Sequence, residues 1–196
     1  MPAAIRLATA ADAARIQAIY AHYVRETVVS FELEPPSVDE MAERLRKAHA
    51  WLVCEAGQGI VAGYAYASKH RDRAAYQWSV DVTVYIDPAF HRKGVGRGLY
   101  TALFGLLRLQ GYYNAYAGIT QPNDGSVGLH TAMGFQPVGV YRGVGYKFGH
   151  WHDVVWLSLR LQPLSASPTA PRPIAAVHNT AEAQSALSIG ATLCHL

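Results

Sequence analysis

The chain has 196 residues, of which 51% are hydrophobic, 11% aromatic and 16% charged, so it fits one globular domain with a packed core and lies outside the disordered range. Its 17 lysines and arginines and 14 aspartates and glutamates give a net charge of +3, too small to mark a nucleic-acid-binding protein. Two distant cysteines argue against a disulfide framework, and the lack of a signal-like segment or a long apolar run predicts a cytoplasmic protein without membrane contact.

The first half of the chain predicts one strand, two helices and a set of antiparallel strands. Residues 5–7 are typical of a short strand, and Thr9 begins a capping-box pattern for a helix to about residue 24. A second such pattern at Ser37 begins another helix. Short runs rich in strand-forming residues follow, separated by glycines and by a polar stretch, and they predict an antiparallel meander. These runs are 51–55, 60–68 and 77–86.

The second half alternates helices and strands. Three glycines after Pro88 lead into a helix that extends to Gln110 and is stopped by Gly111. Residues 123–133 predict a shorter helix, ended by a glycine. The remaining strands are expected at 114–119, 136–141 and 154–160.

The composition changes after Gln162. Proline, alanine, serine and threonine dominate there, with four prolines between residues 163 and 173. We therefore expect a domain over residues 1–162 and a flexible tail over residues 163–196. Within that tail, residues 181–187 show only a weak helical pattern.

The glycine-rich turn indicates a site for a phosphorylated ligand. Gly94, Gly96 and Gly98 lack side chains, so a bulky anion can approach the main chain, and the start of a helix offers unpaired amides and a partial positive charge. Arg92, Lys93 and Arg97 flank the turn and would add side-chain cations. Leu99 follows the last glycine, which excludes a Walker loop and disfavours a dinucleotide fingerprint.

The spacing of Gly94 and Gly96 instead resembles the coenzyme A loop of GNAT acetyltransferases, with His91 at the position where that family usually carries Gln or Arg. From about Ala4 to Leu161 the chain resembles the phosphinothricin acetyltransferase branch of that family. The segments that carry this resemblance include 19–23, 30–35, 73–78, 83–85, 122–124 and 145–154. It implies an α/β fold of the α+β type, with a mixed central sheet of about six to seven strands flanked by about four helices.

The resemblance also implies where acetyl-coenzyme A, the acetyl donor, would bind. The pantetheine arm would lie along the strand containing Val84, Tyr85 and Ile86, and Asn123 would contact the cofactor from the opposite side. The loop for the pyrophosphate comprises Arg92, Lys93, Gly94, Val95, Gly96 and Arg97.

Acetyl transfer to an amine needs a neutral nitrogen and hence a base. Asp81 lies where relatives carry glutamate as the proposed base, and His130 is the second candidate, although a structurally paired carboxylate or a core histidine would give the same sequence pattern. The polar run 69–73 is expected to be a solvated loop except for Arg73, which with Tyr76 matches the segment thought to hold the acidic end of the substrate. Phe31 is expected to close the pocket from above.

The resemblance implies an N-acetyltransferase acting on a small amino-acid-like amine such as phosphinothricin or methionine sulfoximine. A peptide or protein N-terminal acetyltransferase and a non-catalytic coenzyme A-binding module remain as alternatives. No metal is expected, because the histidines at 150 and 152 lie in a segment that matches the family without a metal role. The resemblance also implies a possible homodimer.

Overall fold

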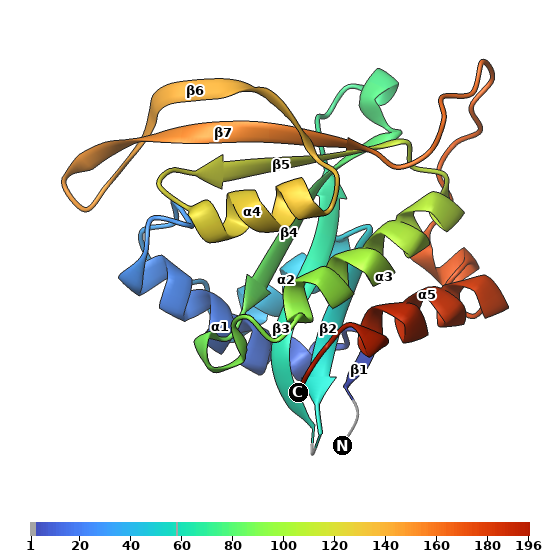
Figure 1. Ribbon diagram of the computed structural model, residues 1–196, viewed down its shortest axis with the longest axis horizontal. Coiled ribbons are helices and arrows are strands. Elements are labelled where there is room, and N and C mark those ends of the chain that lie inside the picture. Colours follow the sequence, from blue (N-terminus) through green and yellow to red (C-terminus); the bar gives the residue numbers. More distant parts are fainter. Residues whose placement is uncertain (1–2, 58) are drawn as a thin grey trace.

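A mixed seven-stranded sheet runs through the protein in the order β1-β2-β3-β4-β5-β7-β6 (Figure 1). The computed structural model describes residues 3–57 and 59–196, so the first two residues of the predicted domain 1–162 lie outside the described residues. The expected mixed sheet of six to seven strands is confirmed. Its strands are β1 (Ala4–Leu7), β2 (Ala50–Ala56), β3 (Ile60–Lys69), β4 (Ser79–Ile86), β5 (Asn114–Thr120), β6 (Gln136–Lys147) and β7 (His150–Arg160).

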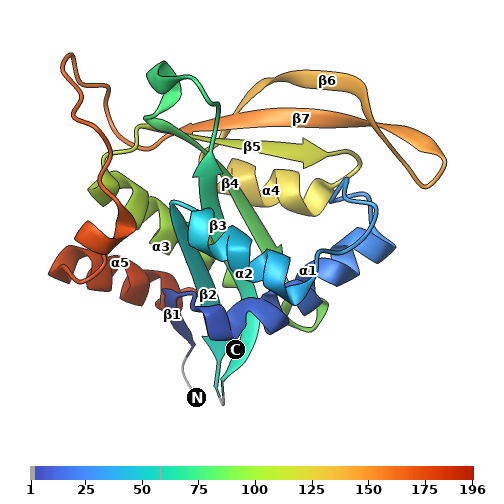
Figure 2. The same ribbon diagram turned by 180° about the vertical axis from the view of Figure 1, so that it is seen from behind.

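In the described residues, five α-helices cover the two faces of this sheet. They are α1 (Ala13–Glu26), α2 (Val38–Lys47), α3 (Val95–Gln110), α4 (Asp124–Ala132) and α5 (Ala181–Thr192). Helices α1 and α2 lie on one face, and α3, α4 and α5 lie on the other (Figures 1 and 2). The capping box expected at Ser37 begins α2, because Ser37 Oγ accepts from the Glu40 amide and the Glu40 carboxylate accepts from the Ser37 amide. In the described part of the chain, no helix has both the length and the hydropathy to cross a membrane.

Strand β4 divides the core because its side chains alternate between the two faces. Val80 and Val82 belong to the large cluster around α3, whereas Tyr85 belongs to a second cluster that packs on α1 and α2. By the same alternation, Asp81 and Thr83 lie on the α1 side of the strand. The sheet therefore separates one group of β4 side chains from α3 and its amino-terminal turn.

Strands β4 and β5 form a fork. They are parallel, and their register covers only three residue pairs, from Ser79↔Asn114 to Asp81↔Tyr116. Beyond Asp81 the strands separate, since β5 continues beside β7 as far as Thr120 while β4 stays beside β3. Helix α3 makes the crossover that two parallel strands require.

The hairpin of β6 and β7 is longer than the sequence pattern predicted. The predicted strands 136–141 and 154–160 lengthen to meet at a two-residue turn, where Phe148 and Gly149 both have positive φ, as a tight hairpin turn needs. Glycines and a register shift between Tyr141 and Gly145 hide the strand alternation in this segment. The buried Lys147 joins the hairpin to the end of α1, because its Nζ donates to the carbonyls of Val24 and Ser30, each at 2.7 Å.

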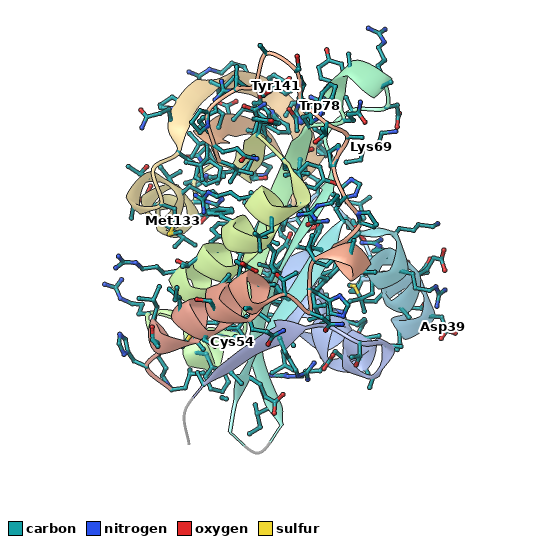
Figure 3. All side chains as sticks on the ribbon, turned by 90° about the vertical axis from the view of Figure 1, so that its right-hand side faces the viewer. Asp39, Cys54, Lys69, Trp78, Met133 and Tyr141 are labelled. Atoms are coloured by element: carbon teal, nitrogen blue, oxygen red, sulfur yellow. The ribbon has the colours of Figure 1, made fainter. Side chains whose placement is uncertain are left out.

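The expected flexible tail is wrong for the carboxy-terminal residues, which fold back onto the domain. Helix α5 packs along α3, as seen from the α5 side in Figure 3. Its residues Ala183 and Leu187 are buried in the core cluster that also contains side chains of α3. The contact is so close that a Cβ placed on Gly98 would lie 2.5 Å from the Gly190 carbonyl oxygen. Small residues give such a helix little apolar periodicity, yet they let two backbones approach and pack.

The end of the chain reaches the glycine-rich turn. The amide of His195 donates to the Lys93 carbonyl at 2.8 Å, and the Leu193 carbonyl oxygen would lie 2.0 Å from a Cβ on Gly94. Cys194 Sγ lies 3.6 Å from Sγ of the buried Cys54. Residues 193–195 therefore pack against the turn and connect it to β2 through the contact of Cys194 with Cys54.

Candidate active site

The turn before α3 forms a concave run of backbone amides. Arg92 and Gly94 both adopt left-handed conformations, with φ of 60° and 76°, and Gly94 caps the amino terminus of α3. Left-handed residues next to a helix start turn successive N–H groups toward one point, where the helix dipole adds positive potential. The first amides of α3 have no partner within the helix. This geometry suits a pyrophosphate.

The side chains around the turn divide into two groups. Arg92, Lys93 and Arg97 are exposed and available to an anionic ligand. His91 instead points back to the end of β4, where its Nε2 lies 2.9 Å from the Tyr23 hydroxyl and 3.2 Å from the Ile86 carbonyl. His91 therefore connects the turn to the end of β4.

A narrow cavity of about 50 Å³ occupies the fork between β4 and β5. It contains four of the residues proposed from the sequence, namely Val84, Tyr85, Asn123 and His130, whereas Ile86 is not among its lining residues. The β5 side of the cavity was not predicted, because its residues, alanine, glycine, isoleucine and threonine, form no motif that marks a binding site in a sequence. The lining comprises Val29, residues 82–85, Tyr100, residues 117–120, Asn123, Ser126 and His130.

His130 is almost fully enclosed and uses both ring nitrogens. Its Nδ1 lies 2.8 Å from the Ser126 carbonyl, to which it donates, so its Nε2 accepts from the Tyr100 hydroxyl at 2.9 Å. Burial lowers the pKa of His130, against the opposing effect of the Ser126 carbonyl. The ring is therefore neutral, and a role as base would require it to give up the Tyr100 hydroxyl. Asn123 caps α4, because its side-chain oxygen accepts from the Ser126 amide at 3.1 Å.

Asp81 lies at the closed end of the fork, in the last pair that joins β4 to β5. Its Oδ1 is 2.6 Å from Nδ1 of His70. Burial raises the pKa of Asp81, and the hydrogen bond from His70 and the charge of Arg71 oppose that rise. The sequence placed His70 in a solvated loop, which is wrong, because only 12% of its side chain is exposed.

None of the three proposed acceptor residues, Arg73, Tyr76 and Phe31, is among the lining residues of the fork cavity. Arg73 is exposed and precedes a short 3₁₀ turn (Ala74–Tyr76), and the Tyr76 ring lies 6.0 Å from the His70 ring. Phe31 packs on the β6–β7 hairpin, where a Cβ on Gly145 would lie 2.2 Å from its ring, and 6.3 Å separates its ring from that of His152. Phe31 is thus fixed beside the hairpin, at the end of α1.

A second cavity, of about 270 Å³, lies between the sheet and helices α1 and α2. It is on the same face as Asp81, since its lining residues Ser68 and Tyr66 are the cross-strand partners of Asp81 and Thr83. Its volume is just below the usual range for small-molecule sites. The lining comprises Tyr20, Met41, Arg44, Lys47, Ala48, Trp51, Tyr64, Tyr66 and Ser68. Nowhere in residues 3–57 and 59–196 do three or more His, Cys, Asp or Glu side chains gather as a metal site would require.

Comparison with known proteins shows what this architecture is similar to. The family described as "Acetyltransferase (GNAT) domain" matches residues 5–156. A phosphinothricin N-acetyltransferase of Streptomyces viridochromogenes is 42% identical over 176 residues, which cover 88% of this chain and 95% of that protein. An L-methionine sulfoximine/L-methionine sulfone acetyltransferase of Pseudomonas aeruginosa is 33% identical over 86% of this chain and its own full length.

A solved structure is similar throughout the domain. It is a GNAT superfamily phosphinothricin acetyltransferase from Sinorhizobium meliloti in complex with AcCoA, and it superimposes with a TM-score of 0.82 at 35% identity. The match covers 86% of this chain and 94% of that structure. The carboxy-terminal part of the chain, including α5, lies beyond the residues 5–156 that the family matches.

Proposed function

The chain belongs to the GNAT acetyltransferase family, and we propose that it transfers the acetyl group of acetyl-coenzyme A to the primary amine of a small amino-acid-like acceptor such as phosphinothricin or methionine sulfoximine. The observation that carries this proposal is that the fork cavity and the glycine-rich turn before α3 lie at successive parts of the same segment of the chain. The fork cavity lies beside β4, and β4 leads directly into the turn at the start of α3. One extended thioester with a pyrophosphate at its far end fits both features.

The turn fits the donor because the positions closest to a phosphate carry no side chain. A Cβ on Gly96 would already approach the Leu129 side chain at 3.0 Å, and the exposed Arg92, Lys93 and Arg97 surround the same amides. We propose that this turn holds the pyrophosphate, that Val84, Tyr85 and Ile86 hold the pantetheine arm and that Asn123 contacts the donor from α4. When bound, acetyl-coenzyme A supplies an activated acetyl carbon; the residues of the chain must orient it and accept a proton.

We place the base function at the Asp81 carboxylate and its hydrogen-bond partner His70, rather than at His130. The Asp81 carboxylate lies on the face opposite α3, where an acceptor can enter without crossing the donor. Burial raises the pKa of Asp81, which makes this carboxylate a stronger hydrogen-bond acceptor for His70 than an ordinary surface carboxylate. His130 has both nitrogens engaged, and in this proposal it positions Tyr100 beside the fork.

Arg73 is proposed to bind the acidic end of the acceptor, with Tyr76 beside it and Phe31 fixed by the hairpin. Arg73→Gln removes the charge and keeps hydrogen-bonding capacity, so kcat/KM for phosphinothricin or methionine sulfoximine should fall by about tenfold to a hundredfold, toward the lower end because the side chain is exposed. The measurement compares an acidic acceptor with its carboxamide analogue at saturating acetyl-coenzyme A. An equal fall in kcat/KM for both acceptors would show that Arg73 does not bind the acidic group of the acceptor.

The acceptor class is tested by thiol release from acetyl-coenzyme A. Phosphinothricin, methionine sulfoximine and a peptide amine are offered separately to the same preparation, with mass spectrometry of each product. Turnover of the two amino acids above the peptide supports the proposal. Preference for the peptide would indicate an N-terminal acetyltransferase, and donor binding without turnover of any amine would indicate a coenzyme A-binding module.

We also propose that two copies of the chain associate through the β6–β7 hairpin. Large apolar side chains are exposed together there, and such patches commonly mark protein interfaces. They are Val138, Val140, Tyr141, Val144, Tyr146, Phe148 and Trp151. Sedimentation of the parent and of Trp151→Lys tests this association, because a monomeric parent would contradict it.

The proposed chemistry uses no metal, and a cytoplasmic location suits it because acetyl-coenzyme A is an intracellular metabolite.

A further inference from the structure

His70 is held in one orientation beside the closed end of the fork. Its ring stacks on Tyr116, with 4.4 Å between the ring centroids and an interplanar angle of 15°. It forms a T-shaped pair with Trp156, with 6.5 Å between the ring centroids. Tyr116 is the register partner of Asp81, so the strand pair that ends at the fork carries both the stacking surface and the carboxylate. An aromatic support and a hydrogen bond together restrict a histidine that the sequence places in a polar loop.

The two nitrogens of His70 have different surroundings. Nδ1 lies 2.6 Å from the Asp81 carboxylate, which can only accept when ionised, so Nδ1 carries the hydrogen. Within residues 3–57 and 59–196, no protein group forms a hydrogen bond with Nε2. A carboxylate that fixes the Nδ1–H tautomer leaves a lone pair on Nε2, the arrangement by which hydrolases make a histidine a base.

We propose that His70 is the base that takes the proton from the acceptor amine, and that Asp81 is a positioning residue that holds the ring and stabilises its charged form. This inference rests on the proposed acetyl transfer. The aspartate side chain is short, and its Oδ1 is already engaged by His70. The imidazole therefore extends the reach of the carboxylate beyond its own oxygens.

The proton balance of the step is simple. Nε2 takes one proton from the acceptor ammonium, which frees the nitrogen lone pair; the new C–N bond forms as the C–S bond breaks. The departing sulfur keeps the bonding electrons and takes up the second proton released by the nitrogen. The imidazolium then returns its proton to water, so one amide, one thiol and one proton result from each ammonium and thioester.

Four titratable or charged groups face the ring from the elements around it. Asp81 comes from β4, Tyr116 from β5 and Tyr76 from the 3₁₀ turn, and the neighbouring Arg71 has its guanidinium over the Trp156 ring at 5.7 Å. Asp81 is the only one of the four that forms a hydrogen bond with the ring among the described residues. The negative charge of Asp81 therefore stabilises a protonated His70 ring through a direct hydrogen bond. The positive charge of Arg71 disfavours the protonated ring, but its guanidinium forms no hydrogen bond with the ring among the described residues.

The decisive variant is His70→Asn. The asparagine amide can still donate to Asp81 from the position of Nδ1, but nothing replaces Nε2. If His70 is the base, kcat/KM for the acceptor should fall by about a hundredfold or more at neutral pH, with acetyl-coenzyme A affinity and thermal midpoint unchanged. The loss should shrink at high pH, where the acceptor amine is neutral without help. A rate within a few-fold of the parent would overturn the proposal and leave His70 as a support for Asp81.

Two further measurements keep the proposal testable if one variant is unstable. In the parent, ¹⁵N NMR of labelled histidine should report His70 with hydrogen on Nδ1 and not on Nε2, and His70→Ala should regain part of its rate when imidazole is added. The opposite tautomer, or a rate that imidazole does not change, would contradict the assignment. A parent that acetylates no amine would contradict acetyl transfer itself, whereas an active parent with a fast His70→Asn variant contradicts only the role of His70.

Discussion

Replacing Gly96 with aspartate is expected to lower the affinity of the protein for acetyl-coenzyme A by about a thousandfold. The new carboxylate would stand among the amides proposed to hold the pyrophosphate, and two charges about 4 Å apart at an effective dielectric near 20 repel each other by about 4 kcal/mol. The fold should persist, because an acidic residue in the first turn of a helix is favourable and the Cβ meets only the flexible end of Leu129.

Gly96→Asn is the matched control for this experiment, since it has nearly the same size and no charge. Isothermal calorimetry of the parent and both variants separates the two effects: a large loss for aspartate and a smaller one for asparagine would locate the phosphate charge at the turn. Unchanged affinity in a folded Gly96→Asp variant would mean that the turn only connects β4 to α3.

Ending the chain after Leu164 is expected to destabilise the domain by several kcal/mol and to lower its thermal midpoint by about 10 °C or more. The deletion removes Leu187 and Ala183 from the core cluster and exposes to water the side of α3 that α5 covers. It also removes the bond from the His195 amide to the Lys93 carbonyl, so the cofactor turn loses its support from behind.

Two leucine substitutions test whether the packing of α5 on α3, rather than the presence of residues 165–196 alone, contributes to the free energy of unfolding. Leu187→Ala should cost about 2 to 4 kcal/mol, because this side chain is 8% exposed, while Leu164→Ala should cost under about 0.5 kcal/mol, because Leu164 is 65% exposed. Chemical denaturation of the two variants measures both values. Equal stability of the two would show that α5 does not pack on α3 in solution.

The sequence predicted the parts of the fold in which pattern and local chemistry agree. The capping box at Ser37, the run of strand-forming residues that becomes β4 and the glycine turn before α3 are all local features, and the structure has each where it was expected. Helix α5 was underestimated because its contacts depend on close backbone approach rather than on large apolar side chains. The β6–β7 hairpin was predicted too short because Gly143 and Gly145 interrupt its alternation.

The candidate site was predicted less evenly. Val84, Tyr85 and Asn123 line the fork, and the resemblance to a known family pointed to them. His70 could not be found in this way, because a histidine within the polar run 69–73 has the sequence context of a surface loop. Its bond to Asp81 depends on the pairing of β3 with β4, a contact between residues eleven positions apart that only the folded sheet establishes.

The close contact between Gly98 and Gly190 has an evolutionary consequence. A Cβ on either glycine would lie 2.5 Å from the carbonyl oxygen of the other, so neither position tolerates a side chain while α5 is in place. A relative that lacks the extension is free to carry alanine or serine at the position of Gly98. In relatives that carry α5, we expect glycine at both positions. In relatives that have lost α5, we expect other residues at the position of Gly98.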